Sequence, residues 1–281
     1  MITFLHTRRV VERNVLAYRR RWYLFVSGFV EPFLYLLSIG IGVGELVGTI
    51  GGVSYREFVA PGMMAAATMN GSIFDTTFNF FHKLRYEHTY DAMLATPLRP
   101  GDVTLGEVTW ALLRGAAYAA AFLVAMIAFG LVHSWWAVLA VPAAVLIGFA
   151  FAGAGAAVTS YVRSWYDFDL INLALIPMFL FSGTFFPLSR YPGWFATVVR
   201  CTPLYQGVAL ERSLVLGRPG LASIGQALYL AALGSLGLAI DPPPGPPPHR
   251  LIRHPSELGT EVRRIRATSV PSLGGRRLRS R

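Results

Sequence analysis

Long apolar stretches separated by short polar connections run through most of this chain. Six of them reach the roughly 20 residues that a helix needs to cross a bilayer. Their approximate bounds are 22–44, 58–81, 104–131, 135–162, 168–187 and 221–240. Backbone groups in lipid must bond within their own segment, and no ten-residue alternation typical of a barrel is present. The pattern therefore predicts an all-α integral membrane protein with six transmembrane helices.

Three other segments depart from this pattern. Residues 1–21 mix apolar positions with arginines, which predicts an amphipathic helix in the membrane interface over Ile2–Arg21. The connection Leu188–Gly220 is too apolar for a free loop and is interrupted by prolines, so we expect two short re-entrant helices in the outer leaflet. The tail, 241–281, is rich in Pro and Arg and is expected to be disordered. The six-helix transmembrane domain then covers 22–240.

The polar block Lys83–Asp102 lies between the second and third expected spans. Its large apolar residues are spaced three and four apart, as one face of a helix requires, and they are Tyr86, Tyr90, Met93 and Leu94. Pro97 disfavours helical geometry at Thr96 and ends the helix. A short amphipathic helix of this kind suits the docking of a soluble partner. A plain solvated helix in a loop fits the pattern equally well.

Basic residues near the span ends set the orientation. If six spans are present, the N-terminal arginines, the polar block, Arg163 and the nine arginines of the tail share one side. That side is predicted to be cytoplasmic, with both termini. A second group of arginines on the opposite side departs from the rule, and its members are Arg56, Arg190, Arg200, Arg212 and Arg218.

Composition agrees with a membrane protein, because 54% of the residues are apolar and only 14% are charged. The net charge of +10 does not indicate nucleic acid, since the arginines gather at span ends and in the tail. The single cysteine, Cys201, excludes an internal disulfide and a cysteine-based metal cluster. No cleavable signal peptide is expected, because the first apolar run lacks a small-residue cleavage site.

Several kinds of chemistry are missing from the sequence. A phosphate-binding P-loop ends in Gly-Lys-Ser/Thr, but the sole lysine, Lys83, lies in Phe-His-Lys-Leu. The six histidines show no metal-ligand spacing, and there is no Gly-x-Ser-x-Gly elbow. We therefore expect no catalytic residue, no metal and no cofactor on this chain. If the protein is a transporter driven by ATP, the ATPase is a separate chain.

A few charged residues fall inside the expected spans, where such groups usually face a bundle interior or a water path. Glu31 and Asp75 would serve as relay carboxylates if the protein were a proton-coupled carrier. Six spans without a visible internal repeat match the usual carriers poorly. Glu107 and Arg114 are seven apart, so they share a helix face but cannot pair with each other. A membrane scaffold that transports nothing is a third alternative.

Two stretches carry a family resemblance. The residues of Phe58–Leu131 include FVAPGMMAAATMNGSIFDTTF and KLRYEHTYDAMLATPLRPGDVTLGEVTWALLRG, and those of Ser182–Trp194 read SGTFFPLSRYPGW. Together they resemble the permease of type-2 ABC exporters, in particular the nodulation-factor and daunorubicin-like antibiotic export permeases. The resemblance covers about Met1–Ile240, and the tail does not match.

The resemblance implies a homodimer of six-span subunits in the bacterial plasma membrane, with two cytoplasmic ABC ATPases that bind ATP and Mg²⁺. It implies a coupling helix at about Glu87–Thr96 that docks the ATPase. The coupling residues would be Glu87, His88, Tyr90, Asp91, Met93, Leu94, Thr96 and Pro97. Cargo in the family ranges over amphipathic drugs, lipids and glycans. A translocation path for such a cargo would involve Glu31, Asp75, Phe78 and Phe185.

Overall fold

This computed structural model describes residues 2–19, 30, 33–34, 36–38, 42–87, 89–94, 98, 100–159, 161–162 and 166–240. These residues are mostly helical. In chain order the elements are α1 (Ile2–Arg19), α3 (Gly44–Val47), β1 (Thr49–Ile50), β2 (Val53–Ser54), α4 (Tyr55–Phe74), the π-helix η1 (Asp75–Asn79), α5 (Phe80–Arg85), α6 (Thr89–Leu94), α7 (Pro100–Ala128), the 3-10 helix η2 (Trp135–Leu139), α8 (Ala140–Thr159), α9 (Asp167–Leu180), the 3-10 helix η3 (Leu188–Arg190), α10 (Gly193–Cys201), α11 (Pro203–Val215) and α12 (Leu221–Ala239).

Three helices of the described part are long and apolar enough to cross a membrane: Pro100–Ala128, Trp135–Thr159 and Leu221–Ala239. They coincide with the third, fourth and sixth expected spans. The second expected span is built from α4, η1 and α5 rather than from one helix, and the fifth corresponds to α9, which has 14 residues. Most of the first expected span and the whole tail lie outside the described residues. The full count of six spans stays a prediction.

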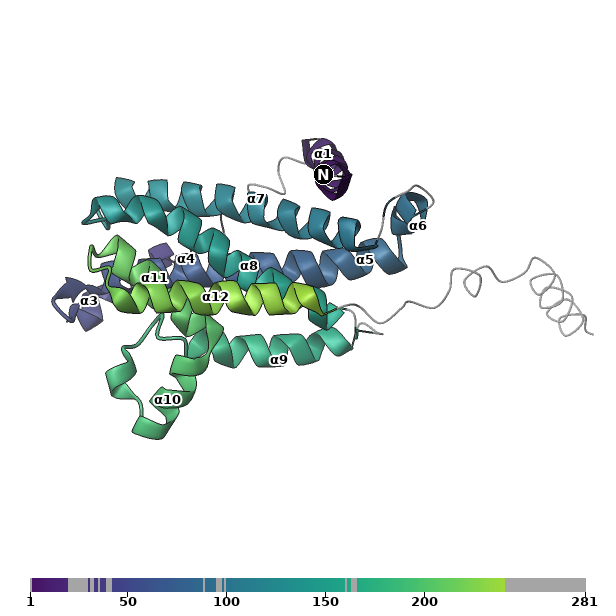
Figure 1. The fold of residues 1–281 in the computed structure, drawn as a ribbon. Coiled ribbons are helices and arrows are strands. Elements are labelled where there is room, and N and C mark those ends of the chain that lie inside the picture. The colour runs from purple at the N-terminus through teal and green to yellow at the C-terminus, as the bar shows by residue number, and fades with distance from the viewer. Residues whose placement is uncertain are drawn as a thin grey trace, which may run out of the picture. The chain divides into compact units, whose positions relative to one another are not determined.

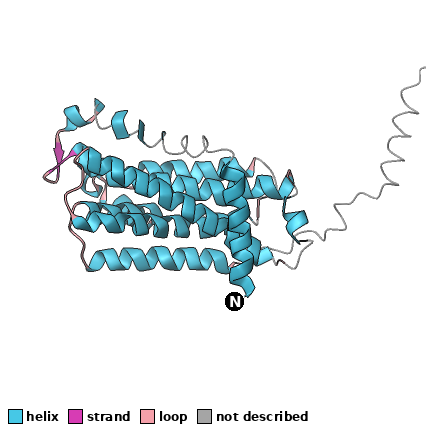
Figure 2. Ribbon diagram, turned by 90° about the horizontal axis from the view of Figure 1, so that it is seen from above, coloured by secondary structure: helices cyan, strands magenta, loops and turns pink. Residues whose placement is uncertain are grey.

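The long helices α4, α7, α8 and α12 run lengthwise beside one another (Figure 1). Helix α1 lies crosswise to them and packs on α7 (Figure 2). Helices α1 and α6 lie toward one end of the bundle, and α3, α10 and α11 lie toward the other (Figure 1). Two short helices, α10 and α11, occur where the sequence predicts two. Their depth in a bilayer stays a prediction.

Local sequence explains where α4 begins. Gly51 and Gly52 both have positive φ, 61° and 85°, so they form the two-residue turn that joins β1 to β2. Ser54 then caps α4, because its Oγ accepts from the Glu57 backbone N–H at 3.4 Å. In return, the Ser54 backbone N–H donates to Glu57 Oε2 at 2.8 Å. The reciprocal cap fixes the direction in which α4 leaves the hairpin.

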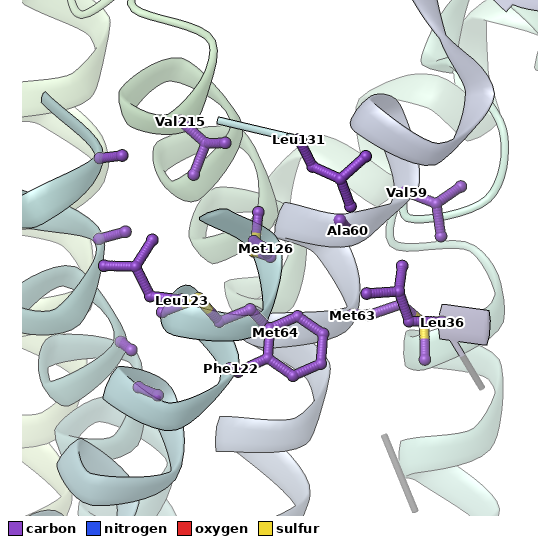
Figure 3. Close-up of a cluster of buried hydrophobic side chains, with 14 of the residues drawn as sticks. Leu36, Val59, Ala60, Met63, Met64, Phe122, Leu123, Met126, Leu131 and Val215 are labelled. Atoms are coloured by element: carbon purple, nitrogen blue, oxygen red, sulfur yellow. The ribbon is translucent and has the colours of Figure 1, made fainter. Parts of the chain in front are cut away.

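The first apolar stretch is attached to the bundle through a core cluster. Leu36 is 4% exposed and packs among residues of α4 and α7, including Met63, Phe122 and Met126 (Figure 3). Val215, at the end of α11, closes the same cluster. Segments far apart in sequence therefore share one apolar core at this end of the bundle.

Helices α8 and α12 approach each other at glycines. A Cβ added to Gly234 would lie 2.8 Å from the Phe149 carbonyl oxygen, and one added to Gly237 would lie 2.7 Å from the Ala154 nitrogen. Neither position has room for a side chain. Small residues at such contacts let helix backbones meet, which is the usual means of association in a bilayer.

We predict that Gly234→Ala destabilises the protein by about 1–3 kcal/mol, because the added methyl group overpacks against α8. Gly225→Ala, on the same helix, is the matched control, since a Cβ there has nothing within 4 Å. It should be neutral or stabilising by about 0.5–1 kcal/mol. Thermal unfolding of the purified variants in detergent compares them. Equal melting temperatures would mean that α8 and α12 do not pack closely.

Candidate functional site

The polar block contains the helix α6, Thr89–Leu94, which lies within the expected Glu87–Thr96. Its anchor is Tyr90, which is 3% exposed and whose ring lies 5.1 Å from that of Phe80 on α5. Met93 is half-buried. Of the other predicted coupling residues, Asp91 and Leu94 are on α6 but their side chains are not described, and His88, Thr96 and Pro97 lie outside the described residues.

The opposite side of the block is exposed. The Glu87 carboxylate accepts from Thr89 Oγ1 at 3.2 Å, and its other oxygen lies 3.7 Å from His82 Nδ1. Leu84 and Tyr86 are large apolar side chains that remain 42% and 55% exposed. The block is thus fastened to the bundle on one side and presents an apolar and acidic surface on the other.

At the start of the block, an ion pair joins α5 to α7. Lys83 Nζ lies 2.7 Å from Glu107 Oε2, and the two side chains are 17% and 5% exposed. The pKa of Tyr90 is raised far above its ordinary value, first by burial and then by the nearby Glu107 carboxylate, so the phenol stays protonated. Helix α1 reaches the same region, because a Cβ on Gly106 would lie 2.6 Å from that of Val10.

A second ion pair joins η1 to α7. Arg114 pairs with Asp75, and the two side chains are 11% and 8% exposed. Asn79 also donates from Nδ2 to Asp75 Oδ1 at 2.7 Å. Glu107 and Arg114, which share a face of α7, thus each pair with a residue of the neighbouring helix. The two pairs form consecutive cross-links between the same two segments.

Hydrogen bonds from threonine hydroxyls stabilise the π-helix η1 between these cross-links. Thr159, at the end of α8, donates from Oγ1 to the Thr76 carbonyl at 2.9 Å and to the Gly155 carbonyl at 2.8 Å. The Thr77 hydroxyl bonds back to the Ile73 carbonyl at 2.6 Å. These contacts satisfy buried polar groups where the α-helical pattern is interrupted.

The residues predicted for a translocation path have different surroundings where the structure describes them. Glu31 lies outside the described residues, and Asp75 is engaged by Arg114. Phe78 stacks on Phe168 with ring centroids 4.1 Å apart. Phe185 instead packs on Phe179, at 5.2 Å, beside the core cluster of Figure 3. No described contact joins Phe185 to the other two.

Sequence reasoning missed two neighbouring residues of α11. Glu211 is completely buried, and neither carboxylate oxygen has a hydrogen-bond partner among the described residues. Arg212 donates to the backbone carbonyls of Phe58 and Gly183, at 3.2 and 2.8 Å, and its guanidinium lies 3.8 Å from the Phe58 ring centroid. Two adjacent charges inside the apolar run Leu204–Leu214 are the signal in the sequence, and Arg212 also belongs to the arginines that depart from the positive-inside rule.

A helical bundle with span-length apolar helices, and with buried charges paired between helices, defines an integral membrane protein. The family model for the ABC-2 type transporter matches residues 6–216. The chain therefore belongs to the ABC-2 type transporter family and is a transport permease.

Three relatives illustrate the similarity. Nodulation protein J of Rhizobium leguminosarum bv. trifolii is 37% identical over 214 residues, which are 75% of this chain and 81% of that protein. Nodulation protein J of Rhizobium meliloti (strain 1021) is 35% identical over 228 residues, 80% of this chain and 85% of the relative. The inner membrane transport permease YadH of Escherichia coli (strain K12) is 23% identical over 189 residues, 64% of this chain and 72% of YadH.

The ion pair of Asp75 gives a test of its role. We predict that Asp75→Asn lowers the free energy of unfolding by about 3–5 kcal/mol, because it leaves the Arg114 charge buried without its partner. Replacing both residues by Leu should recover most of that loss, since it removes both charges together. Thermal unfolding in detergent measures the stability of each variant. A relay role for Asp75 would instead give a stable Asp75→Asn variant without transport.

Proposed function

We propose that this chain is the transmembrane permease subunit of an ATP-driven exporter, and that two cytoplasmic ABC ATPases dock on its polar block. The observation that carries the proposal is the two-sided block: Tyr90 fastens it to the bundle, and Glu87, Tyr86 and Leu84 remain exposed. Leu84 and Tyr86 stay partly exposed near the Glu87 carboxylate, so they are available to contact a docked partner. The absence of a P-loop in the sequence is the reason for placing ATP and Mg²⁺ on separate chains.

The contacts between the block and the bundle would transmit a displacement of α6 to the bundle. A push on α6 reaches α5 through the Tyr90 and Phe80 rings, and α5 is tied to α7 by Lys83 and Glu107. The second cross-link, Asp75 with Arg114, carries the displacement further into the bundle. Displacement of α6 would therefore move α4–α5 and α7 together rather than one helix alone.

The exposed apolar face of α9 can lie against lipid or against a second copy. Its large apolar residues are 50–68% exposed, and they are Leu170, Leu173, Ile176 and Leu180. A path for cargo between two copies would be lined partly by such residues. We propose a homodimer in the bacterial plasma membrane with both termini cytoplasmic, and an amphipathic drug, lipid or glycan as cargo. The relatives named nodulation protein J and inner membrane transport permease support this class.

The alternative of a proton-coupled carrier receives less support. Its relay would use Asp75, whose carboxylate is occupied by Arg114 and Asn79. A relay carboxylate must release and rebind a proton during each cycle, and Asp75 would have to leave its partners Arg114 and Asn79 to do so. The other proposed relay residue, Glu31, lies outside the described residues.

The docking surface predicts the effect of a charge reversal. Glu87→Arg should weaken co-purification with the ABC ATPase of the transporter by roughly tenfold, because it places a positive charge where the block has an exposed carboxylate. Asp169→Arg is the matched control, since Asp169 is an exposed acid in the first turn of α9, outside the block. The two variants change the net charge equally. Equal recovery of the ATPase with both would show that the block does not dock it.

The orientation can be tested with the native thiol. Cys201 is a free, exposed cysteine at the end of α10, so it is accessible to reagents. We expect a membrane-impermeant maleimide to label it in intact cells, and labelling to be lost in Cys201→Ser. Labelling in inside-out vesicles but not in cells would place this connection inside and the polar block outside, where no ATPase reaches it.

A further inference from the structure

The arginines that depart from the positive-inside rule are not scattered in the structure. Three of them, Arg190, Arg212 and Arg218, line one cavity of about 600 Å³. They come from η3, from α11 and from the turn that follows α11. The β1–β2 hairpin and the start of α4 form the facing wall, through residues such as Ile50 and Phe58.

The cavity carries positive charge that the described residues do not neutralise. None of the described residues lining it is acidic. No ion pair with an acid is found for Arg190, Arg212 or Arg218 within the described part of the chain. Arg190 and Arg218 are exposed, so their guanidinium groups are available at the rim. This wall therefore has the charge needed to bind an anion.

Backbone carbonyls and an aromatic ring fix the position of Arg212 but engage only part of its guanidinium group. Its two bonds to backbone carbonyls and its stacking on Phe58 fix the direction of the guanidinium. A guanidinium has five N–H donors, so about three remain. A fixed arginine of this kind recognises phosphate or carboxylate oxygens, because less entropy is lost when the anion binds.

The remaining wall is mainly apolar, with hydroxyl groups only from Thr49 and Ser189 among the described lining residues. Val47, Val53, Phe186 and Leu216 contribute to it, alongside Ile50 and Phe58. A small inorganic anion would leave that surface uncovered. A ligand with an anionic head and an apolar body would satisfy both parts of the cavity.

We propose that this cavity binds the phosphate head group of an anionic membrane lipid. Placing the cavity at the outer leaflet rests on the orientation proposed above. The charge and the apolar lining of the cavity do not depend on that orientation. A retained cluster of arginines on the non-cytoplasmic side is then explained by ligand binding rather than by topology. The arginine Arg200 belongs to the same connection but does not line the cavity.

The test uses the complete chain purified in neutral detergent. Phosphatidylglycerol should raise its melting temperature, and phosphatidylcholine, which has no net charge, should not. The double variant Arg190→Gln with Arg218→Gln should bind phosphatidylglycerol roughly tenfold or more weakly, because it removes two charges from the rim. Arg212 is left intact because its backbone bonds support the fold. The control is Arg200→Gln, which removes a charge from α10 and should bind like the parent.

Three results would overturn the proposal. One is equal stabilisation by phosphatidylglycerol in the double variant and the parent. Another is equal loss of affinity in Arg200→Gln and in each single rim variant, which would indicate a diffuse effect of charge. The third is full protection by inorganic phosphate at a matched concentration, which would make the ligand a free anion. Binding in micelles does not depend on which side the cavity faces, so a reversed orientation in the Cys201 labelling would leave this result unaffected.

Discussion

The close approach of α8 to its neighbours is the constraint on which the described bundle depends. Lipid tails are as apolar as leucine, so helices in a bilayer gain little from apolar burial and associate through contact at short distance. Helix α8 allows this because it is rich in Gly and Ala. A Cβ on Gly148 would lie 2.9 Å from Ser72 Oγ of α4, and one on Gly207 of α11 would lie 2.9 Å from Ile147 of α8. Helix α8 thus packs closely against α4, α11 and α12.

Electrostatics adds specificity to this packing. The pairs Lys83–Glu107 and Asp75–Arg114 are mostly buried, where a charge without a partner is costly. Apolar side chains of similar size would hold the helices about as firmly. The two pairs instead select one arrangement of α5 and η1 against α7, since a shift of either helix would separate both. The polar block begins at Lys83, so its position depends on the same arrangement.

The sequence predicts the features that depend on local pattern. The helices Pro100–Ala128 and Leu221–Ala239 follow from long, mostly apolar runs, and α1, α6, α10 and α11 follow from amphipathic spacing and proline positions. The ion pairs join residues 24 and 39 positions apart, so no local pattern contains them. The burial of Glu211 was missed because an acid in an apolar connection is read as exposed. The path residues and the coupling residues stay predictions.

The π-helix has a geometrical consequence for the cross-links. An α-helix turns by about 100° per residue, so eight regular residues would leave Lys83 about 80° away from Asp75 around the helix. A π-turn accommodates one extra residue, so the eight residues between them cover roughly the rotation of seven, about 20° short of two full turns. Glu107 and Arg114 are seven apart on a regular helix and have the same offset. One inserted residue therefore brings two charges on one helix into phase with two on another, and eight residues wound as a regular α-helix would leave only one pair able to form.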